Sequence, residues 1–173
     1  MFRGATSRSH ADLDIGILRR DVSTVLLGFS NWDVYEAKAG RLAARCPPRL
    51  DVHSLWCRPT VGDPWTIELM LDESDGDTWV YRRDRRIRRS MATAIRHSPD
   101  GLPHLAPEIQ LLYKSKAPRH RDEVDFAQIA PLLTADARRW LHDAIQLTAP
   151  DHKWIRDLRN YGAGARLDSE SKG

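Results

Sequence analysis

The chain has 173 residues, of which 41% are hydrophobic and 29% are charged, and this balance is ordinary for a globular protein with a substantial core. Its formal net charge of +3 is too small to indicate a nucleic-acid-binding protein by itself. No apolar stretch approaches the roughly 18 residues of a membrane span, and the first residues lack the apolar segment of a secretory signal. We therefore expect a cytoplasmic protein with no membrane partner.

Short apolar runs bounded by Pro, Gly or Asp dominate the first half of the chain, as is typical of strands. After the first run, Asp21 is a candidate N-cap for a short helix that extends to about residue 29. Asp75-Gly76-Asp77 is a turn between two of the runs and predicts a hairpin. The predicted strands are 12–18, 32–37, 52–57, 66–71 and 79–81.

From Pro107 onward the apolar residues recur with a helical period. We predict one helix that begins at Pro107, a second over 124–132, and a third that Thr134 caps and Pro150 ends. A last turn is expected over 152–158. The fold class is therefore α+β: a single domain, 1–160, in which a half with a mixed sheet (about 1–105) precedes a helical half (106–160), followed by a flexible tail, 161–173.

The two cysteines, Cys46 and Cys57, match neither the spacing of a zinc site nor a disulfide framework. We interpret them as reduced thiols. The sequence leaves a single disulfide between them open.

An Asp-x-Asp pair, Asp12 and Asp14, stands at the start of the first apolar run. Residues two apart in a strand point to the same face, so these carboxylates would converge while Leu13, Ile15 and Ile17 face the core. Two convergent carboxylates can bind Mg²⁺. The spacing alone is equally compatible with two acids on a solvated surface.

A third acid, Glu68, interrupts the apolar run 66–71. A charge in a buried strand is costly unless it is paired or binds a metal, so Glu68 is a candidate third ligand. The alternation of Glu68 with Ile67 and Leu69 also permits a position facing solvent.

Several segments resemble, in their order along the chain, the small bacterial nucleotidyltransferases of the aminoglycoside and lincosamide adenylyltransferase type, within the polymerase-β-like superfamily. The resemblance covers about residues 2–155. The segments are Arg8-x-His10-x-Asp12-Leu13-Asp14-Ile15, Arg19-Arg20-Asp21, and the stretches 64–71, 79–84, 105–114 and 121–126.

The resemblance implies a protein that transfers AMP from ATP to a hydroxyl group of a small molecule, with an aminoglycoside as one possible acceptor. Asp12 and Asp14 would bind Mg²⁺, and Glu68 would be a third ligand or the general base. Arg8 and His10 of the first segment are candidate nucleotide contacts, and Lys114, which follows the apolar face of the helix that begins at Pro107, is a further candidate because it could reach a triphosphate. Nucleic acid is not expected as a partner.

The family also has a Gly-Gly or Gly-Ser turn and a helix before its Asp-x-Asp, whose backbone amides bind the triphosphate. Met1 falls after the position where this element is expected. Two alternatives follow: the natural start lies upstream, or the protein is a degenerate, non-catalytic relative that acts by binding.

A dense arginine run follows the predicted hairpin. It is interpreted as a solvated hairpin edge, with a patch for phosphate or an acidic partner as the alternative. Its members are Arg82, Arg83, Arg85, Arg86, Arg88 and Arg89.

Overall fold

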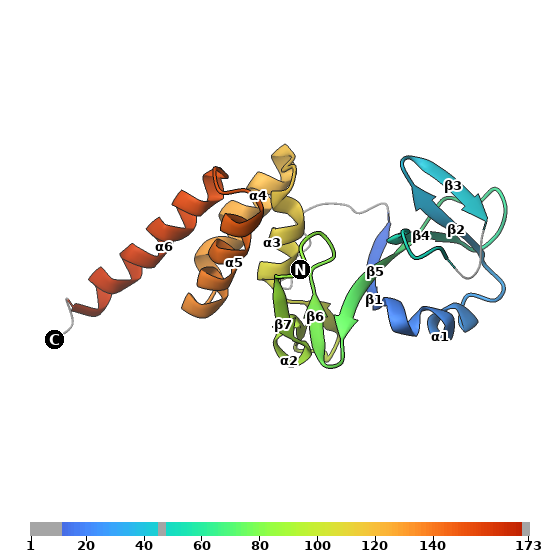
Figure 1. Cartoon of the computed structure of the whole chain (residues 1–173), viewed down its shortest axis with the longest axis horizontal. Helices are drawn as coiled ribbons and strands as arrows, with labels where there is room; N and C mark the ends of the chain where they lie inside the picture. Colours follow the sequence, from blue (N-terminus) through green and yellow to red (C-terminus); the bar gives the residue numbers. More distant parts are fainter. Residues whose placement is uncertain (1–11, 45–47, 171–173) are drawn as a thin grey trace. The chain divides into compact units, whose positions relative to one another are not determined.

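The computed structural model describes residues 12–44 and 48–170, with side chains up to residue 161. The chain divides into two compact units. A sheet unit comprises the described residues up to Ala92 together with His97–His104, and a helical unit comprises Thr93–Arg96 and the chain from Leu105 onward. The predicted α+β class is confirmed, with strands in the first half and helices in the second (Figure 1).

The sheet unit is built on a mixed sheet of seven strands in which β5 is the common neighbour of β1, β4 and β6. β1 runs parallel to β5, whereas every other pair is antiparallel. The path through the sheet is β3-β2-β4-β5-β6-β7. The strands are β1 (Leu13–Leu18), β2 (Asp33–Lys38), β3 (Arg41–Ala44), β4 (Ser54–Arg58), β5 (Ile67–Asp75), β6 (Thr78–Val80) and β7 (Arg88–Ser90).

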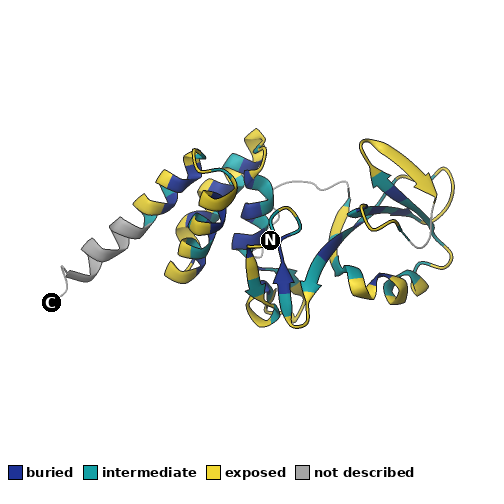
Figure 2. Cartoon of the chain, in the orientation of Figure 1, coloured by how far each residue is buried: buried dark blue, intermediate teal, exposed yellow. Residues whose placement is uncertain are grey.

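One face of this sheet carries the core of the unit, together with η1 (Arg19–Asp21) and α1 (Val22–Leu27). Alternate residues of the strands supply the core, so the intervening residues point to the opposite face. Figure 2 shows the buried colour along the middle strands, with exposed residues on α1 and β3. The buried members are Val22, Val52, Leu55, Cys57, Leu69 and Leu71, and Ile15, Ile17, Ile67 and Val34 pack against them.

The predicted strands and the predicted hairpin are present. β5 is longer than expected and continues to Asp75, where Gly76 adopts a φ of 53° in the turn to β6. β3 was not predicted, because all four of its residues are exposed and show no apolar alternation. Three short elements after β7 were also not predicted: α2 (Met91–Ala94), β8 (Ile95–His97) and β9 (Pro103–Leu105), of which β8 and β9 pair with each other.

The helical unit contains α3 (Pro107–Ser115), α4 (His120–Ile129), η2 (Ala130–Leu132), α5 (Ala135–Thr148) and α6 (Lys153–Glu170). The predicted cap of α5 is confirmed, since the Thr134 hydroxyl accepts a hydrogen bond from the backbone N–H of Ala137 at 3.2 Å. Phe126 of α4 and Trp154 of α6 stack in the core, with ring centroids 4.1 Å apart.

α6 continues to Glu170, into the segment 161–173 that the sequence predicts as a flexible tail. Gly162 and Gly164 suggested a loose tail, because each glycine costs a helix about 1 kcal/mol relative to alanine. The Ala, Arg and Leu residues between and after them favour the helix, and α6 already extends through Trp154 and Leu158, which are buried.

Cys57 is a free thiol in the core of the sheet unit, as expected, while Cys46 lies outside the described residues. Burial raises the pKa of the Cys57 thiol to about 11. Among the described residues, no helix combines the length and the hydropathy needed to cross a membrane.

Candidate metal centre

The three acids proposed from the sequence, Asp12, Asp14 and Glu68, lie together in the structure. The parallel pairing of β1 with β5 sets Asp14 directly opposite Glu68, and Asp12 lies two residues before Asp14. One carboxylate oxygen from each residue lies within 4.8 Å of the other two. Carboxylate oxygens in this arrangement are suitable ligands for a hard divalent cation.

The position of the cluster follows from strand alternation. Ile15 and Ile17 of β1 pack against the core, so Asp12 and Asp14 point to the opposite face of the sheet. Asp14 is exposed, whereas Asp12 and Glu68 are half-buried. The cluster is therefore open to solvent and does not displace apolar side chains.

Glu68 is less acidic than an ordinary glutamate. Burial contributes most to its raised pKa, and the negative charges of Asp14 and Asp12 raise it further. The Ser54 hydroxyl, which donates to Glu68 Oε1 at 2.5 Å, and the positive charge of Arg82 act in the opposite direction. A divalent cation among the carboxylates would relieve their repulsion, so the residues present fit Mg²⁺.

Two residues at this site were not identified from the sequence. Ser54 begins β4 and belongs to no recognisable motif, so no signal in the sequence pointed to it. Arg82 was grouped with the solvated arginine run, although it directly follows Tyr81 at the end of the β5–β6 hairpin. The position of Arg82 directly after the predicted hairpin was the feature of the sequence that could have distinguished it from the other arginines of the run.

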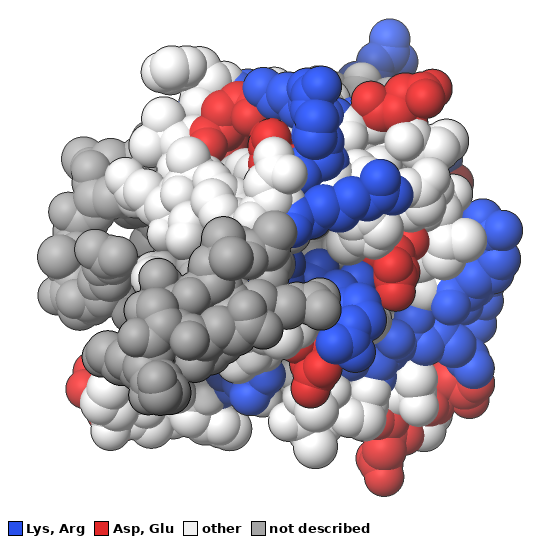
Figure 3. All heavy atoms as spheres, turned by 90° about the vertical axis from the view of Figure 1, so that its left-hand side faces the viewer, with Lys and Arg blue, Asp and Glu red and all other residues white. Residues whose placement is uncertain are grey.

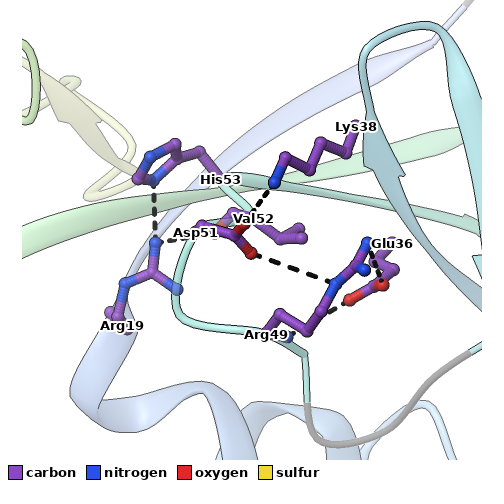
Figure 4. Close-up of polar contacts among 7 residues, drawn as sticks. All are labelled: Arg19, Glu36, Lys38, Arg49, Asp51, Val52 and His53. Carbon is purple, nitrogen blue, oxygen red and sulfur yellow. Dashed lines mark hydrogen bonds and ion pairs between the residues drawn. The ribbon is translucent and has the colours of Figure 1, made fainter.

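A second set of polar contacts joins the end of β1 to β5 and to the loop before β4. Arg19 Nε donates to Glu73 Oε1 at 2.7 Å. Its Nη2 donates to the Val52 carbonyl at 2.7 Å and to His53 Nδ1 at 2.8 Å (Figure 4). Because a guanidinium can only donate, His53 Nδ1 is the acceptor and its imidazole is neutral. Burial, followed by the charges of Arg82 and Arg19, holds the pKa of His53 below its usual value.

The other side of the same loop is held by acid–base pairs, also visible in Figure 4. Arg49 Nη2 lies 2.7 Å from Oε1 of Glu36, whose side chain is buried, and the Arg49 backbone N–H donates to Oε2. Lys38 pairs with Asp51. These contacts fix the chain immediately before Ser54, the residue that binds Glu68.

The predicted nucleotide contacts do not belong to the described part of the sheet unit. Arg8 and His10 lie outside the described residues. Lys114 belongs to the helical unit, where its ammonium group pairs with Asp125 and lies 3.8 Å from Asp122 Oδ1. Asp122 also accepts from Arg119 Nε at 2.9 Å, a contact within the first turn of α4.

The arginine run is mostly exposed, and its members Arg86 and Arg88 pair with acids. Arg86 Nη2 lies 2.6 Å from Asp84 Oδ2, and this contact contributes most to lowering the pKa of Asp84 to about 2. Arg88 Nη2 lies 2.6 Å from Asp75 Oδ2. On the face drawn in Figure 3, basic and acidic side chains are likewise interspersed.

Neither a scan against protein-family models nor a search of curated proteins finds a match to this chain.

Proposed function

We propose that this protein is a Mg²⁺-dependent nucleotidyltransferase that transfers AMP from ATP to a hydroxyl group of a small molecule. The observation that supports the proposal is the register of β1 and β5, which aligns Asp14 with Glu68 and gathers three carboxylates at one point. Phosphoryl-transfer sites commonly use such carboxylates to hold the metal ions.

In this proposal, Asp12 and Asp14 hold the metal, and Glu68 is a third ligand or the general base. Bound Mg²⁺ would neutralise charge on the phosphates of ATP. Glu68 accepts the proton of the acceptor hydroxyl, the hydroxyl oxygen bonds to the α-phosphorus, and the bond from that phosphorus to the bridging oxygen breaks to release pyrophosphate. Burial and the neighbouring acids make Glu68 more basic, which favours this role.

Further parts of the proposal rest on the resemblance described above. Arg8, His10 and Lys114 would contact the nucleotide, and an aminoglycoside is a candidate acceptor. We further propose that the protein acts in the cytoplasm, where ATP is available. Small molecules, rather than nucleic acid or a membrane, would be its partners.

Calorimetric titration with Mg²⁺ and a non-hydrolysable ATP analogue tests the proposal. The wild type should bind the analogue only in the presence of Mg²⁺, and the double variant Asp12→Ala, Asp14→Ala should lose this binding. Asp21→Asn is a matched control, because Asp21 is an acid that follows β1, lies outside the cluster of three acids, and has a side chain that is 55% exposed. Equal heats from the wild type and the double variant would refute the metal site.

Transfer itself requires a second measurement. With ATP labelled at the α-phosphate, a panel of hydroxyl compounds should yield a labelled adduct with the wild type and none with Glu68→Gln. Mg²⁺-dependent binding of the analogue without any transfer would instead favour the non-catalytic relative.

A further inference from the structure

The Ser54 hydroxyl and the Glu68 carboxylate meet on one face of the sheet. The antiparallel register of β4 and β5 pairs Trp56 with Glu68 and Ser54 with Met70. Residues two apart in a strand share a face, so Ser54 is a diagonal neighbour of Glu68 and lies within reach of its long side chain. Ser54 Oγ donates to Glu68 Oε1 at 2.5 Å. This short distance is typical of a hydroxyl that donates to an ionised carboxylate.

Ser54 is the donor that restrains the Glu68 carboxylate. Within residues 12–44 and 48–161, no other side chain donates a hydrogen bond to Glu68. Oε1 receives the Ser54 proton, so Oε2 keeps both of its lone pairs for another partner. Because a glutamate side chain is long and loses rotamer freedom when it is held, the carboxylate would turn freely without this donor.

The direction in which an unrestrained Glu68 would turn is set by charge. One oxygen of Glu68 lies within 4.8 Å of an oxygen of Asp14, the residue opposite it on β1. Like charges at this distance repel each other, so a free Glu68 carboxylate would move away from Asp14. The Ser54 hydrogen bond opposes this movement and keeps the two carboxylates together before any ion is bound.

The backbone that carries Ser54 is itself held in place. The His53 carbonyl accepts a hydrogen bond from the backbone N–H of Leu71 at 3.0 Å. Arg19 Nη2 donates to the Val52 carbonyl and to His53 Nδ1, and the Val52 side chain is buried in the core. The two residues before Ser54 are thus fixed from β5 and from η1. A hydroxyl on such a backbone has a defined position from which it can orient a carboxylate.

We infer that Ser54 is a positioning residue of the proposed metal centre, whose hydroxyl holds Glu68 against Asp14 so that the carboxylates are arranged before a cation binds. The inference rests on the metal site of the proposed function, and Ser54 acts on that site through Glu68. A ligand set that is arranged in advance binds more tightly, because the ordering of the side chain and the approach of like charges have already occurred during folding.

The test measures the Kd of the full chain for Mn²⁺, an ion that prefers the same oxygen ligands as Mg²⁺, from the EPR signal of the free ion. Ser54→Thr and Ser54→Val are a matched pair, because both side chains are β-branched, have the same shape, suit a strand and differ in the hydroxyl. The valine variant should bind Mn²⁺ about tenfold more weakly than the wild type, since groups that orient metal ligands contribute roughly 10–100-fold in affinity. The threonine variant should bind within about twofold of the wild type. Ser74→Ala, which removes the hydroxyl of a half-buried serine of β5, should leave the Kd unchanged.

A double-mutant cycle separates positioning from a structural effect on β4. In a Glu68→Ala background no carboxylate remains to be held, so Ser54→Val should change the Mn²⁺ Kd by less than about twofold. A structural effect of the valine would persist in that background.

Three results would overturn the inference: wild-type affinity in Ser54→Val, a loss of affinity in Ser54→Thr equal to that in Ser54→Val, or an equal effect of Ser54→Val with and without the Glu68 carboxylate. In each of these cases, Mn²⁺ binding by the wild type would leave the proposed function standing. A wild type that binds no Mn²⁺ would refute the metal site and the role of Ser54 together. Binding of Mn²⁺ without binding of the ATP analogue would contradict the proposed function alone.

Discussion

Replacing Glu68 with glutamine should stabilise the metal-free protein. The amide keeps an oxygen that can accept the Ser54 hydrogen bond, and it removes one of three negative charges that lie within 4.8 Å of one another. An acid that lowers the stability of the metal-free fold is the behaviour expected of a ligand in a cation site.

The magnitude follows from the spacing of the charges. Two unit charges at 4.8 Å repel by about 0.9 kcal/mol in water and by about 3.5 kcal/mol at an effective dielectric constant of 20. Asp14 is exposed, so the lower figure applies to its repulsion of Glu68, and the attraction of Arg82 offsets part of the sum. We expect Glu68→Gln to gain about 1 kcal/mol in free energy of unfolding, or about 2–4 °C in Tm.

The gain should depend on pH. Since the pKa of Glu68 in the folded protein lies above its usual value of 4.5, the folded state binds more protons than the unfolded state between these two values. The wild type therefore loses stability as the pH rises through this interval. The advantage of the variant should be complete at pH 7 and absent below pH 4.5.

Thermal unfolding in EDTA at low ionic strength, repeated at pH 7 and pH 4, measures this effect, with Asp21→Asn as the control. Mg²⁺ at 100 times the Kd of the wild type should then stabilise the wild type by about 2.7 kcal/mol, because only the folded state binds the ion. The variant should be stabilised less. If Glu68→Gln shows no gain in EDTA at pH 7, or the same gain at both pH values, the like-charge argument is wrong.

Three further predictions concern the fold. Thr134→Ala should lower the free energy of unfolding in urea by about 1 kcal/mol, because α5 loses its cap, and Thr134→Ser should restore it; an unchanged midpoint would contradict this. His53 should titrate below pH 6.5 by NMR, and because the unfolded state takes up the proton first, stability should fall as the pH drops below 6.5, less so in His53→Gln; a midpoint above 6.5 would rule this out. Iodoacetamide at pH 8 should spare Cys57 in the native protein, since a pKa of about 11 leaves about one thiol in a thousand ionised, and rapid native alkylation would disprove its burial.

Local patterns were sufficient to predict most of the secondary structure. The alternation around Ile15 and Ile17 identified β1, and Thr134 marked the start of α5, because both signals are contained within a few neighbouring residues. β3 has no such signal: its residues are exposed, and only pairing with β2 defines it as a strand.

The candidate site required information that no single segment holds. Asp12 and Asp14 were visible as a pair, but the alignment of Asp14 with Glu68 depends on a parallel register between strands more than fifty residues apart. Ser54 belongs to no recognisable motif in the sequence, and only the pairing of β4 with β5 places its hydroxyl beside Glu68. Side-chain proximity of this kind is a property of topology.

The two glutamates of β5 limit how the length of this strand can vary during evolution. Glu68 faces the acids of β1, while Glu73, an odd number of positions later, lies on the other side of the strand and binds Arg19. One inserted or deleted residue between them would turn one of the two carboxylates to the wrong side. Natural relatives that keep both contacts should therefore conserve the spacing from Glu68 to Glu73 without gaps, even where the residues between them change.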